Sequence, residues 1–127
     1  MSLKTIRDKG RDLTIHEIAG LVSPEEMYQA LNEPDDCEPT TLLLWDMSLA
    51  DVAQVTPDIL RRFIGKAVEL GAGRQGGRTA VVAPDDLQFG LARMSEVFTE
   101  LESAPYDFRA FRTRQEAFEW LGTDDPA

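Results

Sequence analysis

The chain has little positive charge and little cysteine. Its 127 residues carry 13 Lys and Arg against 23 Asp and Glu, a formal net charge of −10. Binding to nucleic acid and docking on anionic lipid headgroups both draw on a surplus of positive charge, so the sequence argues against both partners. The single cysteine, Cys37, excludes an internal disulfide framework and suits a reducing cytosol, so we expect a cytoplasmic protein.

Long hydrophobic runs and catalytic motifs are also missing. The longest apolar stretch, residues 42–45, is far too short to span a bilayer, and the N-terminus lacks the apolar segment of a secretory signal, so we expect no membrane insertion. The single histidine, His16, has no cysteine cluster to share a metal with and no nucleophile-elbow serine, so we interpret it as a strand histidine without a role in catalysis. Cys37 lies in an acidic loop, which disfavours a reactive thiolate. The sequence therefore indicates no enzyme, no metal and no cofactor.

The composition is that of one globular domain. Hydrophobic residues make up 43% of the chain, and its length is close to the commonest domain size. We expect a single domain over residues 1–127, with an ordered core at about 4–122 and a frayed tail at 123–127.

Four capping signals predict four helices. Ser23, Thr56, Asp85 and Thr113 each precede a helical apolar pattern, with proline or an acidic or amide partner at the expected spacing. The stripe expected to face the core after Thr56 consists of Ile59, Leu60, Phe63, Ile64, Ala67, Val68 and Leu70. After Asp85 it consists of Leu87, Leu91, Met94, Val97, Phe98 and Leu101.

Strand patterns lie between these helices, at residues 4–8, 12–19, 40–47, 79–83 and 106–111. The resulting order is β-β-α-β-α-β-α-β-α. Strands separated by helices form parallel sheets, and the first two strands form a hairpin. We therefore predict an α/β fold with a mixed, mostly parallel five-stranded sheet.

Polar residues gather where the strands are expected to end. Asp46 and Ser48 follow one predicted strand and Asp85 follows the next, so they form a candidate pocket at the carboxyl ends of the strands. Two carboxylates there could bind magnesium. The alternative is that Asp85 caps its helix while Asp46 bonds local backbone, which needs no function.

Two other features have a simple structural alternative. Residues 71–76 match G-x-G-x-x-G, but they follow a helix instead of a strand, so we interpret Gly71 as a helix cap and the rest as a flexible turn. A phosphate on Thr56 would lie at a helix N-terminus, where negative charge is stabilised, so Thr56 is a candidate regulatory phosphosite. The alternative is a plain threonine cap.

Several segments carry a family resemblance: residues 77–86 (Gly-Arg-Thr-Ala-Val-Val-Ala-Pro-Asp-Asp), 89–94, 108–113 and 116–121. Together they resemble the small bacterial SpoIIAA-like proteins. These belong to the superfamily that joins STAS domains (sulfate transporter and anti-sigma factor antagonist) with the CRAL-TRIO lipid-binding fold. The resemblance covers about residues 12–122 and implies a SpoIIAA-like, STAS-type fold.

The resemblance implies two kinds of function. Anti-sigma factor antagonists switch partners through a phosphate at the start of the helix after the central strand, which falls near Thr56 here. The usual acceptor string there is Asp-Ser-Ser-Gly, whereas this chain reads Gln-Val-Thr-Pro at residues 54–57. The CRAL-TRIO side implies an apolar ligand between helices and sheet. In a chain of this length we expect the core to use most apolar side chains, leaving little lining for a large lipid cavity.

Our leading hypothesis is a non-enzymatic STAS-like domain that acts through contacts with an unidentified protein partner, in a regulatory role. Self-association as a homodimer is compatible with it, and an exposed apolar patch could be supplied by Phe89, Phe98, Phe118 and Trp120. Two alternatives stay open: a small apolar-ligand or lipid-binding module, and, last, a magnesium-dependent enzyme that uses Asp46 and Asp85.

Overall fold

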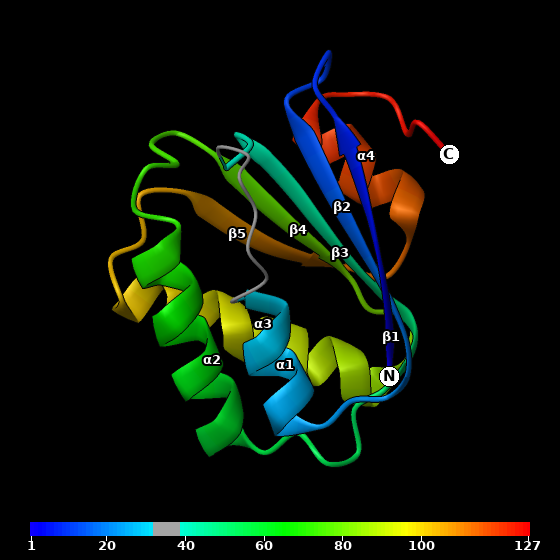
Figure 1. The fold of residues 1–127 in the computed structure, drawn as a ribbon, viewed down its shortest axis with the longest axis vertical. Coiled ribbons are helices and arrows are strands. Elements are labelled where there is room, and N and C mark those ends of the chain that lie inside the picture. Colours follow the sequence, from blue (N-terminus) through cyan, green and yellow to red (C-terminus); the bar gives the residue numbers. More distant parts are fainter. Residues whose placement is uncertain (32–38) are drawn as a thin grey trace.

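The computed structural model describes residues 1–31 and 39–127, which fold around one mixed sheet (Figure 1). The strands are β1 (Ser2–Asp8), β2 (Leu13–Leu21), β3 (Leu42–Asp51), β4 (Arg78–Val82) and β5 (Asp107–Phe111). The helices are α1 (Pro24–Leu31), α2 (Pro57–Leu70), α3 (Asp86–Leu101) and α4 (Arg114–Leu121). The strands lie in the order β1-β2-β3-β4-β5, with β1 antiparallel to β2 and the other pairs parallel. The predicted α/β class, order of elements and mixed five-stranded sheet are confirmed.

The helices cover both faces of the sheet (Figure 1). α1, α2 and α3 lie on one face, and α4 lies on the other. The alternation of β2 decides which residues face which layer: Leu13 and Ile15 pack toward α4, while Thr14, His16 and Ile18 face the other three helices. The largest core cluster lies under α4 and consists of Leu13, Ile15, Leu44, Ala80, Val82, Ala117, Phe118 and Leu121.

The predicted helix starts are confirmed. Thr56 Oγ1 accepts the Ile59 N–H (3.3 Å) at the start of α2, and Thr113 Oγ1 accepts the Glu116 N–H (3.2 Å) at the start of α4. A full capping box joins Asp85 to its helical partner at the start of α3. These side chains satisfy backbone N–H groups that have no partner within the helix.

β3 is longer than the sequence predicts, because it continues past Met47 to Asp51. Beyond Asp46 it no longer pairs with β4 and follows β2 alone, across a bulge. On the open side, Gln88 Nε2 donates to two carbonyl oxygens of the extension (2.8 and 2.9 Å), so part of this edge is satisfied by a side chain from α3. The prediction that Asp46 and Ser48 follow the strand is therefore wrong, since both lie within it.

The predicted buried stripe of α3 is wrong in part: Leu91, Met94 and Phe98 are half-buried, whereas its other members are exposed. This helix buries Gln88, Ala92, Ser95 and Thr99, which are small or polar residues. Leu87, Val97 and Leu101 are 56%, 54% and 64% exposed. α3 packs on β5, and Ala92 meets the short side chains Val81, Ala83 and Ala110 of the sheet. Short residues allow the helix to approach the sheet closely, so size and not hydrophobicity selects the buried face.

The predicted aromatic surface patch does not form as proposed. Phe118 is 5% exposed and belongs to the core under α4. Phe89, Phe98 and Trp120 are partly buried, and each lies beneath an arginine guanidinium 4.4–5.7 Å from the ring centroid. The exposed large hydrophobic residues are aliphatic instead, and α3 contributes three of them.

Candidate functional site

A cavity of about 490 Å³ lies between the sheet and helices α1, α2 and α3. Its volume is within the range of small-molecule sites, roughly 300–1,000 Å³. The helix side of the wall includes Leu60, Phe63, Ile64, Ala67 and Leu91, and the sheet side includes Thr14, His16, Trp45, Thr79 and Val81. The expectation that the core would leave little lining for a ligand is therefore wrong.

The apolar stripe of α2 meets the sheet at one point and lines the cavity elsewhere: the Phe63 ring centroid lies 6.1 Å from that of Trp45 on β3. α2 packs on α1 and α3, and its buried residues Leu60 and Ile64 both line the cavity. On the sheet opposite, Thr14 and Thr79 supply short polar side chains. The stripe that the sequence predicts to face the core thus does so in part and also forms an apolar wall of the cavity.

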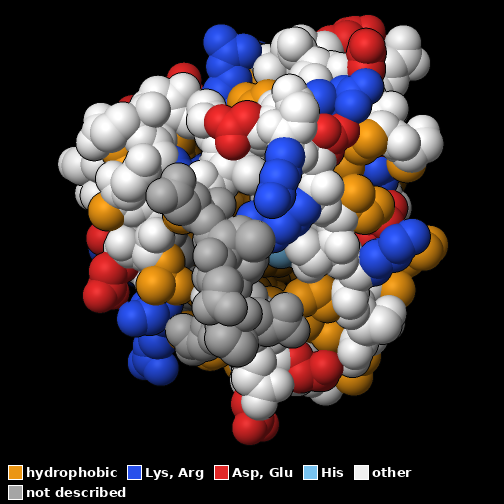
Figure 2. Space-filling view, turned by 45° about the horizontal axis from the view of Figure 1, so that its top comes forward, with side chains coloured by type: hydrophobic (Ala, Val, Ile, Leu, Met, Phe, Trp, Pro, Cys, Tyr) orange, Lys and Arg blue, Asp and Glu red, His pale blue; other side chains and the backbone are white. Residues whose placement is uncertain are grey.

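The wall reaches the surface of the molecule. Among the described lining residues, Thr5, Pro39 and Leu70 are exposed, which places accessible wall near β1 and the C-terminal end of α2. Figure 2 shows a hollow on this side of the molecule, with hydrophobic side chains gathered around it and Lys or Arg side chains beside it. A ligand therefore has a route to the cavity from solvent.

His16 lies in the cavity wall as a neutral ring. Its ring centroid is 4.4 Å from that of Trp45, and its Nδ1 lies 2.9 Å from Thr5 Oγ1. Burial and, to a smaller extent, the nearby charge of Arg7 together lower the pKa of His16 to about 4. At neutral pH the ring adds polar hydrogen-bonding atoms to the wall without adding charge.

Arg74 is the buried cation of the cavity, and sequence reasoning missed it. It is 8% exposed. Its Nε and Nη2 donate to the carbonyl oxygens of Thr40, Thr41 and Arg78 (2.9–3.2 Å), and its Nη1 donates to Thr79 Oγ1 (2.8 Å). The turn predicted at residues 71–76 is therefore present, but Arg74 bonds it to the neighbouring strands, so it is not the flexible turn expected. No local pattern marks this role, because the Thr40 carbonyl lies 34 residues away in the chain.

Two glycines allow the turn around Arg74 to pack closely. A Cβ on Gly71 would meet the Tyr106 ring at 2.8 Å, and one on Gly77 would meet the Thr41 carbonyl oxygen at 2.7 Å. The Gly71 N–H donates to the Ala67 carbonyl (2.9 Å), so the predicted helix cap is confirmed. Gly71 and Gly77 thus allow close packing around a buried side chain, whereas a Cβ on Gly73 or Gly76 would meet no atom within 4 Å.

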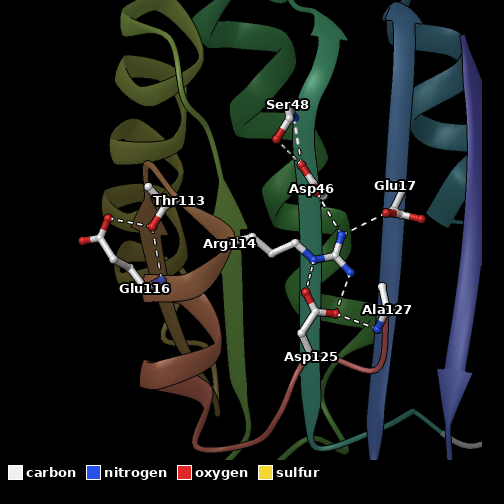
Figure 3. A network of polar contacts seen from close by, with 8 residues as sticks. All are labelled: Glu17, Asp46, Ser48, Thr113, Arg114, Glu116, Asp125 and Ala127. Atoms are coloured by element: carbon white, nitrogen blue, oxygen red, sulfur yellow. Dashed lines mark hydrogen bonds and ion pairs between the residues drawn. The ribbon is translucent and has the colours of Figure 1, made fainter.

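Asp46 belongs to an ion-pair network on the opposite face of the sheet (Figure 3). Its Oδ1 accepts the Ser48 N–H and hydroxyl (2.9 and 2.5 Å), and its Oδ2 accepts from Arg114 Nη1 (3.0 Å). Arg114, at the start of α4, also donates to Glu17 on β2 and to Asp125. Hydrogen bonds to Asp125, Glu17 and Asp46 raise the pKa of Arg114 above its usual range. The tail that the sequence predicts to be frayed is thus bonded to the domain.

The structure groups only part of the predicted pocket. Asp46 and Ser48 bond each other, whereas Asp85 bonds Gln88 in the capping box of α3. None of the three lines the cavity. Within the described parts of the chain, no group of three or more His, Cys, Asp and Glu residues could hold a metal ion.

Thr56 is exposed at the start of α2, where its hydroxyl serves as the helix cap. Arg61, on the same helix, lies over the Phe98 ring.

Cys37 falls outside the residues that the structure describes. Among the helices described, none is both long enough and apolar enough to cross a bilayer.

Comparison with known proteins adds no family. No protein-family model matches the chain, and no curated protein matches it at a significant level. The functional argument therefore rests on the cavity.

Proposed function

We propose that this protein is a non-enzymatic binding module that holds a small apolar, lipid-like ligand in the cavity beneath α2. The observation that carries the proposal is the cavity of about 490 Å³ lined by the apolar stripe of a whole helix. We also keep the sequence-based expectation that the protein works in the cytoplasm.

The energetics favour occupation by an apolar molecule. Each Å² of apolar surface removed from water contributes roughly 25 cal/mol. Leu60, Phe63 and Ile64 face the cavity, so a ligand beside them would gain contacts that protein atoms do not supply.

A SpoIIAA-like, STAS-type fold is part of the proposal. The sequential strand order, with a helix after each of β2, β3, β4 and β5, supports it. The CRAL-TRIO side of the resemblance implies an apolar ligand between helices and sheet, which is where the cavity lies.

A titration with dodecan-1-ol tests the proposal. Trp45 lines the cavity, whereas Trp120 belongs to α4 on the other face of the sheet. In a Trp120→Phe background, Trp45 is the only indole, and its fluorescence should change saturably with one equivalent of bound alcohol. Absence of a saturable change would contradict the proposal.

A matched pair of variants locates the binding. Ala67→Phe places a ring in the cavity wall and should abolish the titration. Ala53→Phe makes the same change at an exposed residue that does not line the cavity, so it should bind as the parent does. Equal binding by both variants would place the alcohol elsewhere.

Regulated protein contact remains the second candidate. It is supported by the exposed Leu87, Val97 and Leu101 of α3 and by the exposed hydroxyl of Thr56. Light scattering of the parent and of Leu101→Lys tests a homodimer through α3, and capture of partners by Thr56→Glu tests the phosphate switch. A monomeric parent and an unchanged partner set would remove this candidate.

A further inference from the structure

The charge of Arg74 has no opposite charge in contact with it. Its four hydrogen bonds to described residues all end on neutral oxygens, three backbone carbonyls and one hydroxyl. Within residues 1–31 and 39–127, no carboxylate lies within ion-pair distance of this guanidinium. Asp12 acts on it only from beyond that distance, and burial lowers the pKa of Arg74 in spite of it. Burying an unpaired charge is expensive, so buried cations are normally paired with an anion.

Two hydrogens at this end of the cavity have no acceptor among the residues that the structure describes. The bonds of Arg74 use four of its five N–H groups, and the remaining N–H is on Nη1. Thr79 Oγ1 accepts from the same Nη1, so its own hydroxyl hydrogen is free to donate. Both residues line the cavity and both are buried.

The rest of the site holds the guanidinium in place. The Tyr106 ring centroid lies 4.5 Å from Arg74 Cζ, and Gly71 and Gly77 let the surrounding backbone approach closely. A side chain fixed in this way provides a preorganised anion site, which loses little conformational entropy on binding. From this site the cavity continues along the apolar residues of α2 toward Trp45 and Met47.

We infer that the natural ligand is an amphiphile with a single carboxylate head, which accepts hydrogen bonds from Arg74 Nη1 and Thr79 Oγ1 while its apolar chain lies along α2. This inference rests on the proposed function and specifies the ligand class of the same cavity. Hydrogen bonds to charged groups are among the stronger polar contacts, so the carboxylate gives both affinity and orientation.

Calorimetric titration of the wild-type protein with dodecanoate and dodecan-1-ol, below their micelle concentrations at neutral pH, tests the inference. The two probes share an apolar chain and differ in the charged head. Dodecanoate should bind about tenfold to a hundredfold more tightly than the alcohol. Equal affinities would overturn the carboxylate inference while leaving the apolar site standing, and binding of neither probe would overturn both.

Variants assign the preference to its residues. Arg74→Gln should reduce the dodecanoate-to-alcohol affinity ratio to about one, and Thr79→Val should reduce it in part while keeping the shape of the side chain. Arg61→Gln removes the same charge from an exposed position on α2 and should keep the parental ratio. An unchanged ratio in a folded Arg74→Gln or Thr79→Val protein would contradict the assignment. If Arg74→Gln does not fold, the affinity ratio of Thr79→Val and the ratio measured for the wild-type protein test the assignment.

Discussion

The rings of His16 and Trp45 lie 4.4 Å apart, tilted by 38°, in the sheet wall of the cavity. β2 and β3 are neighbours in this sheet, and these two residues are register partners. The contact places the single histidine of the chain beside one of its two tryptophans. Both are therefore natural reporters of the cavity.

His16 should make the protein less stable in mild acid. Its folded pKa is about 4, against 6.5 in the unfolded chain, so the unfolded state holds more protons between these values. Stability therefore rises with pH across this window, and the contribution is complete above about pH 6.5. Relative to His16→Gln, the wild-type protein should lose at most about 3 kcal/mol as the pH falls from 6.5 to 4.

Denaturant unfolding at several pH values measures this difference, and NMR titration of the imidazole measures the pKa directly. An imidazole that titrates near 6.5 in the folded protein would contradict the buried placement of His16.

The cavity predicts an unusual result for Ala67→Phe. Enlarging a side chain in a filled core destabilises a protein by about 1–3 kcal/mol. Because Ala67 lines the cavity, the added ring should instead stabilise the ligand-free protein by about 1 kcal/mol. Chemical denaturation of Ala67→Phe and of the parent, with Ala53→Phe as control, shows whether the added ring raises or lowers the free energy of unfolding. A clear loss of stability in Ala67→Phe would indicate that the space is filled.

The Arg114 network predicts a cost for losing one cation. Arg114→Gln leaves the carboxylates of Glu17, Asp46 and Asp125 together without their shared partner. Since these groups are partly buried, the free energy of unfolding should fall by about 1–3 kcal/mol.

Arg112→Gln is the matched control for Arg114→Gln, because Arg112 pairs with an almost fully exposed Asp86. Exposed pairs contribute about 0–1 kcal/mol, so this variant should unfold close to the parent. Equal losses in the two variants would mean that the network adds nothing beyond surface charge.

The two faces of α3 should respond in the opposite order to the one the sequence predicts. Leu101→Ala removes an exposed side chain and should change stability by less than about 0.5 kcal/mol. Ala92→Leu enlarges a residue that is 5% exposed against the sheet and should destabilise by about 1–3 kcal/mol. Thermal or chemical unfolding measures both changes in stability. A larger loss of stability for Leu101→Ala than for Ala92→Leu would support the stripe that the sequence predicts.

The local signals of the sequence predicted the fold well. Caps such as Thr56 and Asp85 act through backbone groups three residues away, so their effect is visible in a short window of sequence. The strand predicted at residues 12–19 is likewise local, since side chains alternate between the faces of a sheet, and Leu13 and His16 lie on opposite faces.

The candidate site was less predictable because it depends on contacts between residues far apart in the sequence and on the sizes of the side chains that pack together. An apolar stripe has the same pattern whether it meets a sheet or an open cavity, so the stripe of α2 did not reveal the space beside it. Arg74 is fixed by the carbonyl oxygens of Thr40 and Thr41, which no nearby residue signals. On α3 the hydrophobic pattern predicted burial for residues that are exposed, since close approach to the sheet favours Ala92 over larger residues.

A crystal structure of the protein soaked with ω-bromododecan-1-ol tests the central claim most directly. The anomalous signal of bromine reports where the apolar chain lies, independently of affinity. The account predicts a bromine peak between α2 and the sheet, with the chain against Phe63 and Trp45. A cavity without bromine density, or one closed by α2 packed onto Thr14 and Thr79, would contradict it.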